Sequence, residues 1–408
     1  MVSLKNYISK LLFNDTDNAY AILTYIDMDG IFTEPCIHSY VNDVFQNNNQ
    51  LHQRILEKNN QLFLENIDLI DIKDYYSILY TKHTQFDSYI DTMLNDTFNT
   101  DLKWKFLFCI DKESNKTRYY FKIHHSIADG YLIIKMLTSP FQATDLTKQL
   151  KRKTTFFNTV YYYFIGTILL LVIHIKHVIH LIVKSFNRSV PDCTFTKRNT
   201  DSIVFKNLNF QEIKQFTKKN NITMNDFLYS LMIKTDHLYR KEEKTLLTTS
   251  SMNISGTTQS NNMCPIIIPI KNSYPISTLL TNVNRTFNNF KYSLFTPCLY
   301  IVLKGITPYI PLNLLSNLYT IVLDDTDYVY SNIIGPSNPF ISKDMNITDI
   351  HFLTNSKHKE IVYNIISFED NINIICSFKQ GVIQDKDEFK KCLYDAYSTI
   401  LRNSVWVP

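Results

Sequence analysis

Residues 124–130 read His-His-Ser-Ile-Ala-Asp-Gly, and the structure predicted on either side of them decides how this part of the chain folds. Upstream, residues 104–110 and 117–124 are rich in aromatic and β-branched side chains and flank a polar turn, which predicts a β-hairpin. Downstream, residues 130–137 are predicted to form a helix. The two histidines therefore lie where a strand ends and a loop begins, and strand alternation predicts that they point to opposite faces.

The rest of the chain divides into three ranges of different character. Residues 1–150 mix helical and strand-like segments, residues 151–190 are strongly apolar, and residues 191–408 return to alternating strands and helices. The elements predicted in the last range are a strand at 202–205, helices at 211–219 and 225–240, a hairpin at 361–368 and 372–378, and a final helix at 386–402.

The middle range holds a segment with the length of a membrane-spanning helix. Residues 156–175 carry no formal charge, and as a helix they would extend ~30 Å. The turns that follow are amphipathic, because His177 and His180 recur on one side and Val178 and Ile179 lie largely opposite. Basic residues flank both ends, so the charge distribution does not choose an orientation across a bilayer.

Composition argues against several kinds of partner. The 42 basic and 38 acidic residues give a net charge of +4, without the run of like charges that would bind nucleic acid. Seven glycines are too few and too scattered for the glycine-rich loops that bind nucleotides. His174, His177 and His180 lie three residues apart, which turns each ring by ~60° around a helix and favours an interfacial helix over a metal site. We expect no metal and no nucleic-acid partner.

Four short motifs occur in an order that resembles a known family. The pattern at residues 124–130 resembles the His-His-x-x-x-Asp-Gly signature of the acyltransferase superfamily that includes chloramphenicol acetyltransferase, carnitine acyltransferases and peptide-synthetase condensation domains. Residues 102–104, Leu-Lys-Trp, resemble the Pro-Leu-Trp motif of wax ester synthase/diacylglycerol acyltransferases, and residues 224–228 resemble their Asn-Asp helix start. Residues 331–336, Ser-Asn-Ile-Ile-Gly-Pro, are similar to their Ser-Asn-Val-Pro-Gly-Pro. The resemblance covers most of the chain.

This resemblance implies an α/β fold of two chloramphenicol-acetyltransferase-like subdomains, built from mixed sheets and helices, with an active-site tunnel between them. Residues 1–150 would form the N-terminal subdomain and residues 191–408 the C-terminal one. Residues 151–190 would join them as a membrane-associated linker. Acyl-CoA would be the co-substrate, and no further cofactor is expected.

The resemblance also assigns roles to individual residues. His125 would be the general base, a task that neutral imidazole suits near neutral pH, and would pass its proton to the leaving CoA thiolate. Asp129 would hold the loop in place, and Gly130 would keep the channel beside the histidine open. The implied catalytic set is His124, His125 and Asp129, and the implied substrate-binding set is Gly130, Asn225, Asp226, Asn332 and Gly335.

Several of these residues have a structural alternative. Asp129 suits the cap of the helix that follows it. Thr223 and Asp226 are close to a capping box, and for Asn225 and Asp226 we favour a structural role over chemistry. Asn332 and Gly335 also suit a turn.

The expected function is transfer of a long-chain acyl group from acyl-CoA to a fatty alcohol or diacylglycerol, which makes wax esters or triacylglycerol. Residues 102–103 depart from the family's Pro-Leu and leave substrate preference open. Acylation of another alcohol or amine is therefore an alternative, as is a noncatalytic membrane-associated binding protein of the same fold. Trp104 is expected in the core rather than at the site.

The predicted site also constrains the apolar segment. If residues 156–175 crossed a bilayer once, His125 would lie on one side and Asn225 and Asn332 on the other, and no common site could form. We therefore expect residues 156–184 to enter one leaflet as a monotopic anchor. The expected location is the cytosolic face of the endoplasmic reticulum, where acyl-CoA and a lipid alcohol would both be within reach.

Overall fold

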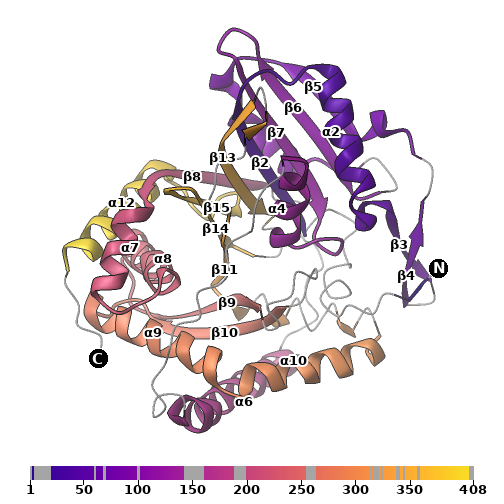
Figure 1. Ribbon diagram of the computed structural model, residues 1–408. Coiled ribbons are helices and arrows are strands. Elements are labelled where there is room, and N and C mark those ends of the chain that lie inside the picture. The colour runs from indigo at the N-terminus through magenta and orange to yellow at the C-terminus, as the bar shows by residue number, and fades with distance from the viewer. Residues whose placement is uncertain are drawn as a thin grey trace.

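A computed structural model shows an α/β fold of mixed sheets (Figure 1). The structure describes residues 2–3, 20–58, 61–67, 70–98, 102–141, 160–187, 199–253, 263–311, 314–315, 321–322, 325–336, 341–342, 345–355 and 359–403. The first six-stranded sheet has the order β12 (Ile341–Ser342), β13 (Met345–Thr354), β2 (Ala21–Asp29), β7 (Lys116–His124), β6 (Trp104–Asp111), β5 (Tyr76–Tyr80).

The second six-stranded sheet has the order β10 (Met263–Lys271), β9 (Thr245–Asn253), β11 (Tyr328–Ile333), β14 (Ile361–Phe368), β15 (Asn371–Lys379), β8 (Thr200–Asn209). Strand β11 runs parallel to β9 and β14, whereas β15 runs antiparallel to both of its neighbours. A small third sheet contains β1 (Val2–Ser3), β4 (Gln61–Asn66) and β3 (Gln53–Lys58).

Helices bury the apolar faces of the two large sheets. Helices α2 (Glu34–Gln46) and α4 (Gly130–Thr138) share one core with the first sheet, and α3 (Ser88–Asn95) contributes to another. The second sheet shares its core with α7 (Phe210–Lys219), α8 (Met224–Arg240), α9 (Ile276–Tyr292) and α12 (Lys386–Arg402). Helices α6 (Thr167–Asn187) and α10 (Phe295–Ile306) lie side by side at the edge of the molecule (Figure 1).

The hairpin that precedes residue 124 confirms the sequence prediction. Strands β6 and β7 pair in antiparallel register around a turn that begins at Asp111. The Asp111 carboxylate accepts the amide hydrogens of Glu113 at 3.0 Å and Ser114 at 3.2 Å. Asn115 then takes a left-handed conformation with φ of 53°, which asparagine tolerates well. Local polar chemistry therefore sets the turn, and the turn brings β7 back to the site.

The C-terminal helix is also where the sequence predicts it, at residues 386–402. Asp385 caps it, because its carboxylate accepts hydrogen bonds from the amides of Asp387 at 3.0 Å and Glu388 at 2.9 Å. The buried residues Phe389, Leu393, Ala396 and Ile400 recur every three or four positions and face the second sheet. The cap and the apolar periodicity indicate the same helix, so the sequence was enough to predict it.

Strand β13 joins the first sheet although its residues lie far along the chain. It pairs antiparallel with β2, so the sheet containing residues 104–124 is completed by residues 345–354. Its other side contacts the second sheet, where Asn373 donates to the Ile350 carbonyl at 2.8 Å and Ser377 donates to the Thr354 carbonyl at 2.7 Å. The division at residues 1–150, 151–190 and 191–408 stays a prediction, and β13 was not predicted to cross between the two bodies.

Candidate active site

The backbone fixes the histidine doublet from both sides. His124 is the last residue of β7, and its amide donates to the Lys103 carbonyl at 2.9 Å, just before β6. The next amide, of His125, donates to the Tyr20 carbonyl at 2.8 Å, just before β2. The doublet therefore lies where the sequence places it, at the end of a strand held between two neighbours. The prediction that the two rings face opposite ways stays a prediction.

The side chain of His124 is buried and oriented by a neighbour two residues away. Its Nδ1 lies 2.7 Å from Ser126 Oγ and 3.3 Å from the Ser126 amide nitrogen. These contacts fix the imidazole plane at the start of the loop. Ser126 was not predicted as a site residue, although it lies only two positions after His124.

His125 lies in an environment that keeps it neutral. Burial lowers the pKa of the imidazole below its ordinary value of 6.5, and the neighbouring His124 lowers it further. The Asp129 carboxylate opposes that shift but does not reverse it. A neutral imidazole at physiological pH is the form that accepts a proton, so this environment suits a general base.

The direction of this shift predicts a pH profile. As the pH falls, a base becomes inactive when it is protonated, and His125 is protonated only below 6.5 because its pKa is lowered. We expect the acidic limb of kcat/KM to have its midpoint below pH 6.5. Measuring kcat/KM for ester formation from pH 4.5 to 8 tests this, and a midpoint above 6.5 would contradict it.

Asp129 and Gly130 connect the loop to the next helix. The Asp129 carboxylate accepts the Leu132 amide hydrogen at 2.9 Å, which makes it the N-cap of α4. Gly130 lies against β11, and a Cβ atom placed on it would be 2.2 Å from the Cδ1 atom of Ile333. Glycine at this position therefore lets the residue 124–130 motif contact the residue 331–336 motif directly.

Asn225 joins the predicted site residue Asn332 to Tyr330, which was not predicted. Its Oδ1 atom accepts hydrogen bonds from Tyr330 Oη at 2.9 Å and from Asn332 Nδ2 at 3.0 Å. Asn225 lies in the first turn of α8, and the other two lie on β11. Tyr330 was missed, although two-residue spacing places it on the same face of the strand as Asn332.

Gly335 is required by close backbone packing. A Cβ atom at this position would lie 1.8 Å from the Ser367 carbonyl oxygen in β14. The Gly335 amide nitrogen lies 3.2 Å from Ser367 Oγ and donates to it. The segment after β11 thus runs against the neighbouring strand at a distance that only glycine permits. Its role here is structural, and a role in substrate binding stays a prediction.

The structure supports a structural role for Asp226. Thr223 Oγ1 accepts the Asp226 amide hydrogen at 3.1 Å, and Asp226 Oδ2 accepts the Thr223 amide hydrogen at 2.7 Å, which completes a capping box. Asn284 Nδ2 also donates to Asp226 Oδ2 at 2.7 Å. Asp226 is buried, so its carboxylate links α8 to α9. A role in substrate binding stays a prediction.

The Asp226→Ala variant distinguishes the two roles. Loss of the cap and of the Asn284 partner is expected to lower the free energy of unfolding by about 2 kcal/mol. Activity per folded molecule should stay near that of the wild type at a temperature where both are folded. Urea unfolding and an activity assay measure the two effects, with Asp387→Ala, an exposed acid in the first turn of α12, as the control. A large loss of activity in stably folded Asp226→Ala would assign it to chemistry.

Residues 102–104 lie beside His124, and their contacts are structural. Trp104 is buried, its Nε1 donates to the Leu51 carbonyl at 3.0 Å, and its ring stacks on Tyr75 with centroids 4.6 Å apart. The prediction that Trp104 belongs to the core is confirmed. Leu102 is buried as well, and the Lys103 carbonyl is the acceptor for His124.

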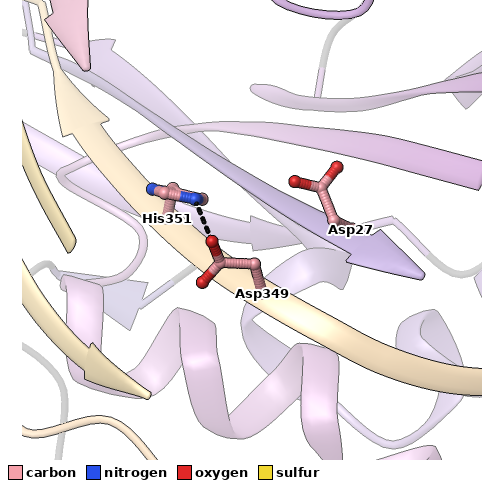
Figure 2. Close-up of side chains that lie close together, drawn as sticks. All are labelled: Asp27, Asp349 and His351. Carbon is pink, nitrogen blue, oxygen red and sulfur yellow. Dashed lines mark hydrogen bonds and ion pairs between the residues drawn. The ribbon is translucent and has the colours of Figure 1, made fainter. Parts of the chain in front are cut away.

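Among the described residues, one group could offer three ligands to a metal ion: Asp27, Asp349 and His351. Figure 2 shows Asp27 on β2 and the other two on β13, with His351 Nε2 2.9 Å from Asp349 Oδ2. Arg118 binds both carboxylate oxygens of Asp27, at 2.5 and 2.8 Å. Because Arg118 already neutralises Asp27 and His351 Nε2 already pairs with Asp349, we assign no metal to this group.

Comparison with known proteins shows a family likeness in the C-terminal part of the chain. Residues 260–401 match the family model described as the WS/DGAT C-terminal domain. This match includes residues 331–336, where Asn332 meets Asn225 and Ile333 meets Gly130. The resemblance stated from the four motifs is thereby confirmed. No curated protein matches the sequence at a significant level.

Solved structures extend the likeness over the whole chain. The wax ester synthase/diacylglycerol acyltransferase from Marinobacter aquaeolei VT8 has a TM-score of 0.64 at 11% identity, covering 99% of this chain and 100% of that one. Trichothecene 15-O-acetyltransferase from Fusarium sporotrichioides has a TM-score of 0.68 at 9% identity, covering 98% and 94%. The starter condensation domain of rhizomide synthetase, solved with C8-CoA, has 0.59 at 9%, covering 100% and 96%.

These likenesses establish the fold. The predicted α/β class, with chloramphenicol-acetyltransferase-like subdomains of mixed sheets, is confirmed. Together with the WS/DGAT domain, the fold implies an acyltransferase of the wax ester synthase/diacylglycerol acyltransferase type.

Proposed function

We propose that this protein transfers a long-chain acyl group from acyl-CoA to the hydroxyl of a fatty alcohol or diacylglycerol. The observation that carries the proposal is the contact between the motif at residues 124–130 and the motif at residues 331–336, in a chain whose residues 260–401 match the WS/DGAT model. Gly130, five residues after His125, abuts Ile333, and the preceding residue, Asn332, is hydrogen-bonded to Asn225. These contacts support a site formed by a base and polar groups from three separate segments.

In the proposed mechanism His125 acts as general base. The acceptor hydroxyl gives its proton to the imidazole while its oxygen attacks the thioester carbonyl carbon. The tetrahedral intermediate collapses, the carbon–sulfur bond breaks, and the imidazolium returns the proton to the CoA sulfur. The products are an ester and free CoA, with no covalent enzyme intermediate, metal or further cofactor.

The local contacts support this assignment of roles. The paired backbone hydrogen bonds to Lys103 and Tyr20 fix the position of the base, and the Asp129 cap fixes the loop that follows it. Asn332 Nδ2 uses one hydrogen to reach Asn225, which leaves a second for a developing oxyanion. The C8-CoA complex of a condensation domain with this fold supports acyl-CoA as the donor.

We also propose that the protein works at a membrane, on the cytosolic face of the endoplasmic reticulum. Tyr162–Leu181 is long and apolar enough to cross a bilayer by length and composition, and it is the one such helix in the described part of the chain. A monotopic position is supported by its contacts with the protein body, which are described below. An amphiphilic donor and a lipid acceptor would both reach a site beside such a helix.

The test of the reaction is direct. Protein incubated with radiolabelled palmitoyl-CoA and hexadecanol or diacylglycerol should form a labelled ester and release one CoA thiol per ester. Ester with one acceptor alone would identify that acceptor. Thiol release only with other alcohols or amines would redirect the proposal to those acceptors, and no transfer to any acceptor would leave a binding protein of this fold.

A further inference from the structure

Two long stretches of this sequence contain no acidic residue. Residues 146–191 and 272–323 have neither Asp nor Glu, in a chain with 38 such residues among 408. Both stretches do contain lysine and arginine, including Lys176 in the first and Lys291 and Lys304 in the second. Two apolar regions that keep basic residues and lack acidic ones have the charge pattern expected of segments that face the same negatively charged partner.

The fold brings these two stretches together. Helix α6 comes from the first, and α9 and α10 come from the second, and α6 contacts both (Figure 1). The Leu294 amide donates to Thr167 Oγ1 at 3.0 Å, and the rings of Tyr162 and Tyr292 stack with centroids 5.9 Å apart. Helices from two separate stretches of the sequence, each without acidic residues, thus lie against each other.

Helix α6 contacts the protein at several points between its first turns and residue 180. Gly166, just before the helix, and Leu170 are buried against the body. Farther along, His177 Nδ1 lies 3.6 Å from Asp325 Oδ2, and His180 Nε2 lies 3.3 Å from Asp325 Oδ1. A helix with contacts over this range is oriented across the surface rather than away from it, which suits a monotopic position.

The outward face of α6 is largely apolar. His177, predicted to lie on the polar side of this helix with His180, has its ring turned toward Asp325 of the protein body, and Val178 and Ile179 on the opposite side are exposed. This face carries apolar side chains that would be costly to leave in water. These exposed residues are Ile165, Ile168, Leu169, Leu171, Val172, Ile175, Val178 and Ile179.

Helix α10, which was not predicted from the sequence, continues this apolar face. Ile301 is 67% exposed, and Val302 and Ile306 are also exposed. Beyond the helix, Tyr309 is 87% exposed, and at the start of the α6 segment Tyr161 and Tyr163 are exposed too. Tyrosines at the ends of an apolar face are typical of the boundary between lipid and water.

We propose that α6 and α10 together form one surface that docks, with both helices in the plane of the membrane, onto an anionic lipid leaflet. The apolar side chains would enter the acyl boundary, and the exposed Lys176 and Lys304 would meet anionic headgroups. A second copy of the chain is a poorer occupant, because it would bring like charges together without any acid to pair them. The proposal deepens the membrane association proposed above and does not depend on acyl transfer.

Vesicle flotation of the full chain tests the surface. We expect wild-type protein to float with phosphatidylcholine vesicles that contain about 30% phosphatidylserine, and to float less with phosphatidylcholine alone or at high salt. The Ile301→Glu/Val302→Glu variant places two charges on α10 and should lower vesicle partitioning by about tenfold or more. Tyr80→Glu, at a 58% exposed apolar residue on β5, is the matched control and should float like wild type.

Two further measurements separate the possible failures. Ester formation from octanoyl-CoA and a short alcohol, dispersed below micelle concentration, should be unchanged in the α10 variant. This readout reports the proposed chemistry independently of docking. The surface proposal is overturned if the variant floats like wild type, if wild type does not bind vesicles, or if light scattering shows a dimer that the variant abolishes without a change in flotation.

Discussion

The His125→Ala variant is expected to lose ester formation by about 10²- to 10⁴-fold while keeping its fold. Alanine removes the group that takes the hydroxyl proton, and its methyl group has no basic atom to replace the imidazole. The backbone hydrogen bond from residue 125 to the Tyr20 carbonyl does not need the imidazole, so the strand end should persist. The measurement is kcat with saturating palmitoyl-CoA and hexadecanol or diacylglycerol, beside a thermal unfolding scan.

A matched histidine provides the control for this variant. His38 is exposed on α2, and His38→Ala should leave kcat unchanged. The pH profile gives a second check, because residual activity in His125→Ala should lose the acidic limb assigned to the imidazole. A stably folded His125→Ala protein with less than about a 100-fold loss would show that His125 is not the general base.

The Gly335→Ala variant is expected to lower the free energy of unfolding by about 3 kcal/mol, more than the corresponding change at Gly130. The added carbon would lie 1.8 Å from the Ser367 carbonyl oxygen, which belongs to the backbone of a central strand and has no rotamer with which to move aside. Relief requires separating the residue 335 segment from β14. Urea unfolding, followed by circular dichroism, measures the change.

Gly130→Ala is the informative partner of that variant. Its new carbon would lie 2.2 Å from Ile333 Cδ1, the terminal atom of a flexible side chain that can adopt another rotamer. We therefore expect a smaller loss of stability than at position 335, together with a change in KM or chain-length preference as the Ile333 side chain shifts. Equal losses of stability at the two positions would contradict the distinction drawn between backbone and side-chain contact.

Much of the local structure was readable because the relevant signals are local. The turn at Asp111, the cap at Asp385 and the capping box at Thr223 each use side chains within three residues of the backbone they satisfy. Apolar periodicity then fixed which face of each element is buried. Elements defined by cap and period, such as residues 386–402, were therefore predicted to within a residue or two.

The pairing between distant segments was not readable. Strand β13, residues 345–354, completes the first sheet, and its own sequence does not specify that it pairs with β2. Asp325 pairs with His177 and His180 across more than 140 residues, and this contact turns the His177 side of α6 toward the protein. Tyr330 and Ile333 entered the site only once β11 was placed beside α8 and α4.

The sequence by itself determined the motif at residues 124–130, its position after a strand, and the order of the segments that would meet it. Those features depend on neighbours along the chain, where short-range hydrogen bonds and side-chain alternation are decisive. Only the tertiary structure decided that Gly130 abuts Ile333, that Asn225 holds Asn332, and that α6 turns its apolar face outward beside α10. Such contacts depend on which buried faces fit together in space, and the spacing of residues within any one segment does not specify that fit.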